Sequence, residues 1–178
     1  MIKAGSLEEL LTSVENAPTA VPVTVLVDGP SGAGKTSAAR DLSRRTGWHA
    51  VHLDEFYPGW HGLSAASRMV ASNVLAPRNP GYWRWDWAND CRGEWVSLAG
   101  VGNLIVEGVG ALTKVNLAAA RARGQALSIF IDGPRSQRRA RALERAPDYE
   151  QWFEVWESQE RTYFQQLCAP AQFSWTWS

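Results

Sequence analysis

The stretch Gly29-Pro30-Ser31-Gly32-Ala33-Gly34-Lys35-Thr36 matches the phosphate-loop pattern G-x-x-x-x-G-K-[ST] at every fixed position. Residues 23–27, directly before it, form a β-branched run typical of a buried parallel strand, and residues 36–45 can form a helix. A phosphate-binding site needs a strand, then the loop, then a helix, because the loop amides and the N-terminal end of the helix bind phosphate together. The stretch therefore predicts a nucleoside triphosphate site in an α/β fold.

Each part of this loop has a predicted role in binding ATP and Mg²⁺. Lys35 is expected to reach the β- and γ-phosphates, and the Thr36 hydroxyl is expected to ligate the metal. The glycines allow the tight backbone that points the amides at phosphate oxygens. The predicted nucleotide contacts are Gly29, Ser31, Gly32, Ala33, Gly34, Lys35, Thr36 and Ser37.

Length and composition limit the class of protein. The 178 residues are expected to form a single domain, and the net charge of zero offers no global basic field for nucleic acid. Cys91 and Cys168 form no C-x-x-C pair, and no apolar run approaches a membrane span. We therefore expect a cytoplasmic protein with no nucleic-acid or membrane partner.

Two acidic residues follow predicted strands, where ligands of parallel α/β sheets gather. Asp54 comes after the strand predicted over 48–53, and it can accept the proton of an attacking hydroxyl or act as a cap or ion-pair partner. The neighbouring Glu55 is an alternative base, or a solvated side chain. Glu107 comes after the strand predicted over 103–106, where a carboxylate usually holds Mg²⁺ directly or through water.

An aromatic, charged segment covers residues 82–87. Arg84 can bind an anion, Asp86 can accept hydrogen bonds from sugar hydroxyls, and the tryptophans can hold a flat or apolar group. The segment therefore predicts either a substrate-recognition wall or an edge hairpin with residues 94–98.

Five arginines lie close together after the strand predicted over 126–131. They belong to an expected lid segment, about 133–146, on which Arg138, Arg141 and Arg145 share one helical face and Arg135 and Arg139 share a neighbouring one. Guanidinium groups of a closing lid stabilise charge on a transferred phosphoryl group, whereas the alternative is a solvated basic helix. A separate amphipathic helix is predicted at the N-terminus, over about 6–16.

In chain order, the loop, Asp54-x-Phe56-Tyr57, Glu107-Gly108 and Arg135-x-x-Arg138-Arg139 resemble the uridine kinase and phosphoribulokinase group. The resemblance implies a three-layer fold with about five parallel strands and helices on both faces. It also implies that Asp54 is the base or hydroxyl ligand, Tyr57 lies at the acceptor site, Glu107 assists Mg²⁺ and Arg135, Arg138 and Arg139 belong to the lid. Asp86 is loosely similar to a sugar-binding aspartate of that group.

The function these features predict is ATP-dependent transfer of the γ-phosphoryl group to a hydroxyl of a small metabolite, with a nucleoside-like acceptor favoured. Kinases of nucleoside monophosphates, sugar acids or antibiotics are alternatives with the same chemistry. An ATP-binding regulatory switch is an alternative of another class, although the chain has no N-K-x-D element for guanine. A homodimer is a further open arrangement, because exposed tryptophans mark interfaces as well as pockets.

Overall fold

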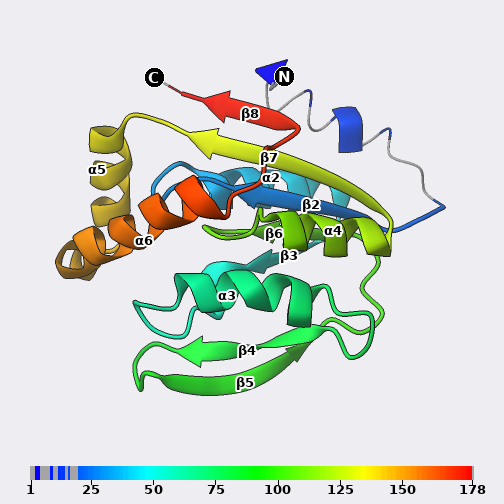
Figure 1. Ribbon diagram of the computed structural model, residues 1–178, viewed down its shortest axis with the longest axis horizontal. Coiled ribbons are helices and arrows are strands. Elements are labelled where there is room, and N and C mark those ends of the chain that lie inside the picture. The colour runs from blue at the N-terminus through cyan, green and yellow to red at the C-terminus, as the bar shows by residue number, and fades with distance from the viewer. Residues whose placement is uncertain (1–2, 5–8, 10–11, 15, 17–19, 178) are drawn as a thin grey trace.

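The computed structural model describes residues 3–4, 9, 12–14, 16 and 20–177. Figure 1 shows a parallel sheet between helices. Its order is β1 (Lys3–Ala4), β8 (Phe173–Thr176), β7 (Gln125–Asp132), β2 (Val23–Asp28), β6 (Leu104–Glu107) and β3 (His49–His52). The predicted parallel sheet of about five strands is confirmed from β8 to β3, and the two-residue β1 adds a sixth strand beside β8.

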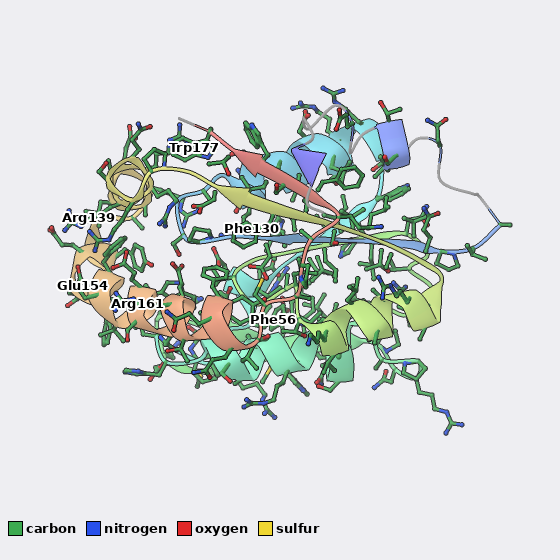
Figure 2. All side chains as sticks on the ribbon, turned by 45° about the horizontal axis from the view of Figure 1, so that its top comes forward. Phe56, Phe130, Arg139, Glu154, Arg161 and Trp177 are labelled. Atoms are coloured by element: carbon green, nitrogen blue, oxygen red, sulfur yellow. The ribbon has the colours of Figure 1, made fainter. Side chains whose placement is uncertain are left out.

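Helices cover both faces, as a three-layer fold requires. They are α2 (Lys35–Thr46), α3 (Leu63–Met69), α4 (Lys114–Arg123), α5 (Arg135–Arg145) and α6 (Phe153–Gln166). Alternate residues of β2 point to opposite faces: Val25 packs in the core under α2, and Leu26 packs in the core shared with α3, α4 and α6. Figure 2 shows these two helical layers on either side of the sheet.

The aromatic segment forms a separate antiparallel hairpin of β4 (Gly81–Asp86) and β5 (Cys91–Ser97). In Figure 1 this hairpin lies beyond α3, at the end of the molecule nearest β3. Tyr82 contacts Phe56 with ring centroids 5.0 Å apart, and the indole N–H of Trp87 donates to the carbonyl of Asp54 at 3.0 Å. The hairpin is therefore attached to the segment that follows β3.

Two helices are extended by irregular turns. Helix α3 is followed by a π-helical turn, η2 (Val70–Val74), and α6 is preceded by a 3₁₀ turn, η3 (Pro147–Trp152). Another 3₁₀ turn, η1 (Leu53–Glu55), follows β3. Of the N-terminal helix predicted over 6–16, residues 6–8, 10, 11 and 15 lie outside the described residues, while 9 and 12–14 are helical.

Helix α4 had no counterpart in the sequence analysis. Its start is fixed by Thr113, whose side chain accepts a hydrogen bond from the Asn116 amide at 3.0 Å. In the part of the chain that the structure describes, every helix is too short or too polar to span a membrane.

Candidate functional site

The phosphate loop runs from the end of β2 to the start of α2, and its shape depends on glycine. A Cβ atom on Gly32, where φ is 76°, would lie 2.1 Å from the backbone oxygen of Arg138 in α5. A Cβ atom on Gly29 would lie 1.9 Å from the backbone oxygen of Ile131. Lys35 lies at the start of α2 and donates from Nζ to the Pro30 carbonyl at 3.0 Å. The loop is therefore held closely between β7, α2 and α5.

The buried carboxylate of Asp28 accepts a hydrogen bond from the first residue of the phosphate loop. Its Oδ1 atom accepts from the Gly29 amide at 2.7 Å, and Oδ2 accepts from the Leu112 amide at 2.7 Å and the Tyr163 hydroxyl at 2.6 Å. Burial raises the pKa of Asp28, although these hydrogen bonds counteract the shift. Asp28 was not among the site residues predicted from the sequence.

Thr36 and Glu107, the two predicted metal-binding residues, lie together. The Thr36 hydroxyl donates to Glu107 Oε1 at 2.9 Å, and the same oxygen lies 2.6 Å from His52 Nδ1. Burial would raise the pKa of Glu107, but the His52 hydrogen bond and the charge of Lys35 outweigh burial and hold it below its ordinary value. An ionised carboxylate beside a hydroxyl is a hard oxygen ligand set, which fits Mg²⁺.

Asp54 lies in η1, between the phosphate loop and the hairpin. Its side chain is exposed to the cavities described below, and its carboxylate accepts no hydrogen bond from any described residue. The cavity walls nonetheless displace much of the water around it, so desolvation raises the pKa of Asp54, and the charge of Glu107 raises it further. An unpaired carboxylate of raised pKa has the properties of a general base.

Two adjoining cavities meet at Asp54. One cavity, about 330 Å³, is lined by α5 and by loop residues Ser31, Gly32 and Gly34 to Ser37, and we name it the nucleotide cavity after the prediction for this loop. The other, about 460 Å³, extends from the loop toward aromatic side chains, and we name it the acceptor cavity after the predicted second substrate. Residues that line both are Ser31, Thr36, Asp54, Glu107 and Arg145.

The arginines of α5 divide into two groups. Arg141 and Arg145 line the nucleotide cavity. Arg138 donates from Nη1 to the Ser31 carbonyl at 3.2 Å, so it contacts the loop backbone. The structure thus brings this face of α5 to the phosphate loop.

Arg135 and Arg139, two of the predicted catalytic residues, point elsewhere. Arg135 Nε donates to Glu157 at 2.6 Å, and Arg139 Nη2 donates to Glu150 at 3.0 Å. Figure 2 labels Arg139 and Glu154 at the outer end of α5 and α6. Neither arginine lines the two cavities, because glutamates of η3 and α6 pair with this outer face of α5.

One of the predicted substrate residues, Tyr57, lines the acceptor cavity, whereas Arg84 and Asp86 lie outside its lining. Tyr57 lines the acceptor cavity with its ring, but its buried hydroxyl donates to the Val109 carbonyl at 2.7 Å. Arg84 pairs with Glu55 at 3.0 Å and lies on the hairpin outside the cavity lining. The Asp86 carboxylate accepts hydrogen bonds from the backbone and side-chain amides of Asn89, in the turn that follows it, and Asp86 is also outside the lining.

Trp87 lines the acceptor cavity, and it belongs to the segment 82–87 that was predicted to form either a recognition wall or an edge hairpin. Most of the wall was not predicted from the sequence; the side chains concerned are Arg40, His52, Trp60, Tyr149 and Trp156. Trp60 lies five residues after the end of η1, and the sequence Pro58-Gly59-Trp60 is typical of a turn after a strand end. The other aromatic residues come from segments far apart in sequence.

The site and fold together define a P-loop protein with the α/β architecture of small-molecule kinases. Solved structures with this fold include a possible uridine kinase from Bacillus stearothermophilus, 19% identical, with a TM-score of 0.55, covering 95% of this chain and 96% of that chain. They also include a proposed fructose transport system kinase from Silicibacter sp. TM1040, 17% identical, with a TM-score of 0.59, covering 97% and 100% of the two chains.

Sequence comparison adds one short match. The chain is 43% identical over 37 residues to a cytidylate kinase from Bdellovibrio bacteriovorus. This match covers 21% of this chain and 17% of that protein. No protein-family model matches the chain. The resemblance to uridine kinase-like P-loop kinases is thus confirmed at the level of the fold.

Proposed function

We propose that this protein is an ATP-dependent phosphotransferase that moves the γ-phosphoryl group to a hydroxyl of a small metabolite. The observation that carries the proposal is the position of Asp54, an unpaired carboxylate at the junction of the two cavities. A base must lie within hydrogen-bond reach of the hydroxyl that attacks the phosphorus. In this arrangement the acceptor occupies one cavity, the nucleotide occupies the other, and the reacting atoms meet beside Asp54.

In this proposal, different residues bind the phosphates, bind the metal and accept the hydroxyl proton. Lys35 and the loop amides hold the phosphates, and Thr36 and Glu107 would hold Mg²⁺, which would neutralise charge on the phosphate oxygens. The acceptor oxygen forms a bond to the γ-phosphorus while the bond to the β–γ bridging oxygen breaks. Asp54 accepts the hydroxyl proton, and ADP leaves with the bridging oxygen.

Helix α5 supplies the positive charge in this proposal. Arg141 and Arg145 face the phosphates, and Arg138 orders the loop backbone at Ser31. The segment 133–146 acts as a lid of the single domain that excludes water from the reaction. Arg135 and Arg139 have an indirect role here, because their ion pairs with glutamates fix the orientation of α5.

The proposal includes a nucleoside-like acceptor, which the resemblance to uridine kinases favours. Nucleoside monophosphates, sugar acids and antibiotic alcohols would use the same base and the same phosphate site. The cytoplasmic location and the homodimer remain predictions.

The test is ADP release from Mg-ATP with a panel of nucleosides, nucleoside monophosphates, sugars, sugar acids and amino-bearing alcohols. Lys35→Ala serves as the blank, because it removes the charge that binds the phosphates. Acceleration by one class of alcohol supports the proposal. If ATP binds but no small acceptor accelerates release, while a protein partner does, the regulatory switch replaces the kinase.

A further inference from the structure

The acceptor cavity ends in a group of aromatic rings around Trp60. The ring centroid of Trp60 lies 5.0 Å from that of Trp87, 5.5 Å from Tyr149, 5.4 Å from Trp152 and 6.4 Å from Trp156. Trp87 is 40% exposed, so part of its ring surface stays open. The cavity therefore offers a substrate a wall of π surface.

Three hydrogen-bonding groups of this wall are used within the protein. The Tyr57 hydroxyl and the Trp87 indole N–H donate to backbone carbonyls, and the Tyr149 hydroxyl donates to Ser31 Oγ at 3.3 Å. Among the described residues that line the cavity there is no asparagine or glutamine. These three residues therefore offer a substrate mainly their ring surfaces.

Negative charge lies beside the aromatic wall, and positive charge lies at the nucleotide end. Asp54 is unpaired, and Glu55 uses Oε2 for its bonds while Oε1 has no described partner. Three cations also line the acceptor cavity: Arg145 lines both cavities, Arg40 lies one helical turn after Thr36, and His52 Nδ1 lies 2.6 Å from Glu107 Oε1. These cations are therefore associated with the Thr36 and Glu107 end of the cavity. Asp54 is the carboxylate-bearing residue next to Trp87, whose indole N–H donates to its carbonyl.

We infer that the acceptor is an alcohol that carries an ammonium group, such as an amino alcohol or an amino sugar. The negative face of an aromatic ring attracts a cation, most strongly at tryptophan, and a nearby carboxylate adds to the attraction. The ammonium group lies against Trp60 and Trp87 beside Glu55, and the hydroxyl lies at Asp54. This inference rests on the proposed function, since it names the substrate class of the same site.

The test uses pairs of alcohols that differ in charge but have matched shape. Choline, an amino alcohol, is compared with 3,3-dimethylbutan-1-ol. Glucosamine, an amino sugar, is compared with glucose. The two pairs show which of these two kinds of alcohol the cavity binds. Binding is measured by calorimetry with a non-hydrolysable Mg-ATP analogue present. We expect the charged member of at least one pair to bind more tightly, by roughly threefold to thirtyfold.

Two tryptophan variants connect this preference to the wall. Trp87→Leu keeps apolar bulk but removes the ring, so we expect it to lose most of the preference for the charged member. Trp83→Leu is the matched control, because Trp83 is 45% exposed on the same hairpin and contacts Trp95 instead of the cavity. We expect this control to keep the preference. Nucleotide affinity reports whether each variant is folded.

The outcomes separate this inference from the proposed function. Equal binding within both pairs, tighter binding of the neutral members, or a preference that survives Trp87→Leu would overturn the inference. If neutral alcohols are phosphorylated and charged ones are not, the inference fails while the kinase proposal stands. If charged alcohols bind but none is phosphorylated, the kinase proposal fails while the binding inference stands.

Discussion

Replacing Tyr57 by phenylalanine separates two roles of this residue. The resemblance to uridine kinases puts the tyrosine at the acceptor, whereas the structure engages its hydroxyl with the Val109 carbonyl at 2.7 Å, in a side chain only 1% exposed. If the hydroxyl is structural, Tyr57→Phe leaves a buried carbonyl unpaired. The ring, which lines the cavity, is kept.

The expected loss of stability follows from that hydrogen bond. A buried group left without its partner costs about 1–3 kcal/mol. For a domain of this size, each kcal/mol lowers the melting temperature by about 2–4 °C, so Tyr57→Phe is expected to lower it by about 2–12 °C. Tyr163→Phe calibrates this scale, because its hydroxyl donates to two acceptors, Asp28 and Leu112, in the same core.

The assay combines thermal unfolding with steady-state kinetics for the acceptor. We expect the melting temperature to fall while the acceptor KM and kcat change by less than about threefold. An unchanged melting temperature together with an acceptor KM raised about tenfold or more would refute this reasoning, because the hydroxyl would then bind substrate.

Three further predictions concern the transfer itself. Arg145→Ala is expected to lower kcat by about 100-fold or more, whereas Arg135→Ala, on the outer face of α5, is expected to lower it much less, because Arg135 only helps to orient the helix; equal losses in steady-state kinetics would contradict this. Glu107→Gln is expected to raise the Mg²⁺ concentration for half-maximal ADP release by about 10–100-fold, and an unchanged magnesium titration would be evidence against a metal role. Because the pKa of Asp54 is raised, activity is lost as pH falls through a value above the ordinary aspartate pKa of 3.8, so the acid limb of kcat/KM should lie above that value; a limb at or below it would exclude Asp54 as the base.

The sequence predicted those parts of the site that are local in the chain. The loop from Gly29 to Thr36 follows a β-branched run and precedes a helical segment. The strand, the turn and the helix could therefore be predicted from residues that are close in sequence. Glu107 was also found, because an acidic residue after an apolar strand lies at the carboxyl edge of a parallel sheet. The contact between Thr36 and Glu107 is long-range, yet the position of both residues at one sheet edge made it predictable.

Helix α5 carries five arginines, and the structure turns only one of its faces toward the phosphate loop. Helical spacing grouped Arg138, Arg141 and Arg145 on one face, and this is the face that meets the phosphate loop and the nucleotide cavity. The resemblance instead selected Arg135 and Arg139 with Arg138. Which face turns inward depends on the packing of α6, and that packing is not encoded locally.

Apart from Trp87, the aromatic wall could not be predicted from the sequence. Trp60, Trp87, Tyr149 and Trp156 come from the turn after β3, the hairpin end, η3 and α6, and they meet only when the whole chain has folded. The sequence predicted one possible wall from the tryptophans of residues 82–87, which are Trp83, Trp85 and Trp87. The ladder shifts register between Trp83 and Trp85, and Trp87 follows the strand, so they do not share one environment.

The most direct test of the account is detection of the phosphorylated acceptor. An acceptor found in the panel is incubated with ATP labelled at the γ-phosphorus, and the products of the wild type, Asp54→Asn and Lys35→Ala are separated and identified by mass spectrometry. We predict labelled acceptor ester with the wild type, and a loss of product with Asp54→Asn although ATP still binds. Product formation by Asp54→Asn at the wild-type rate, or label that appears only as inorganic phosphate, would contradict the account.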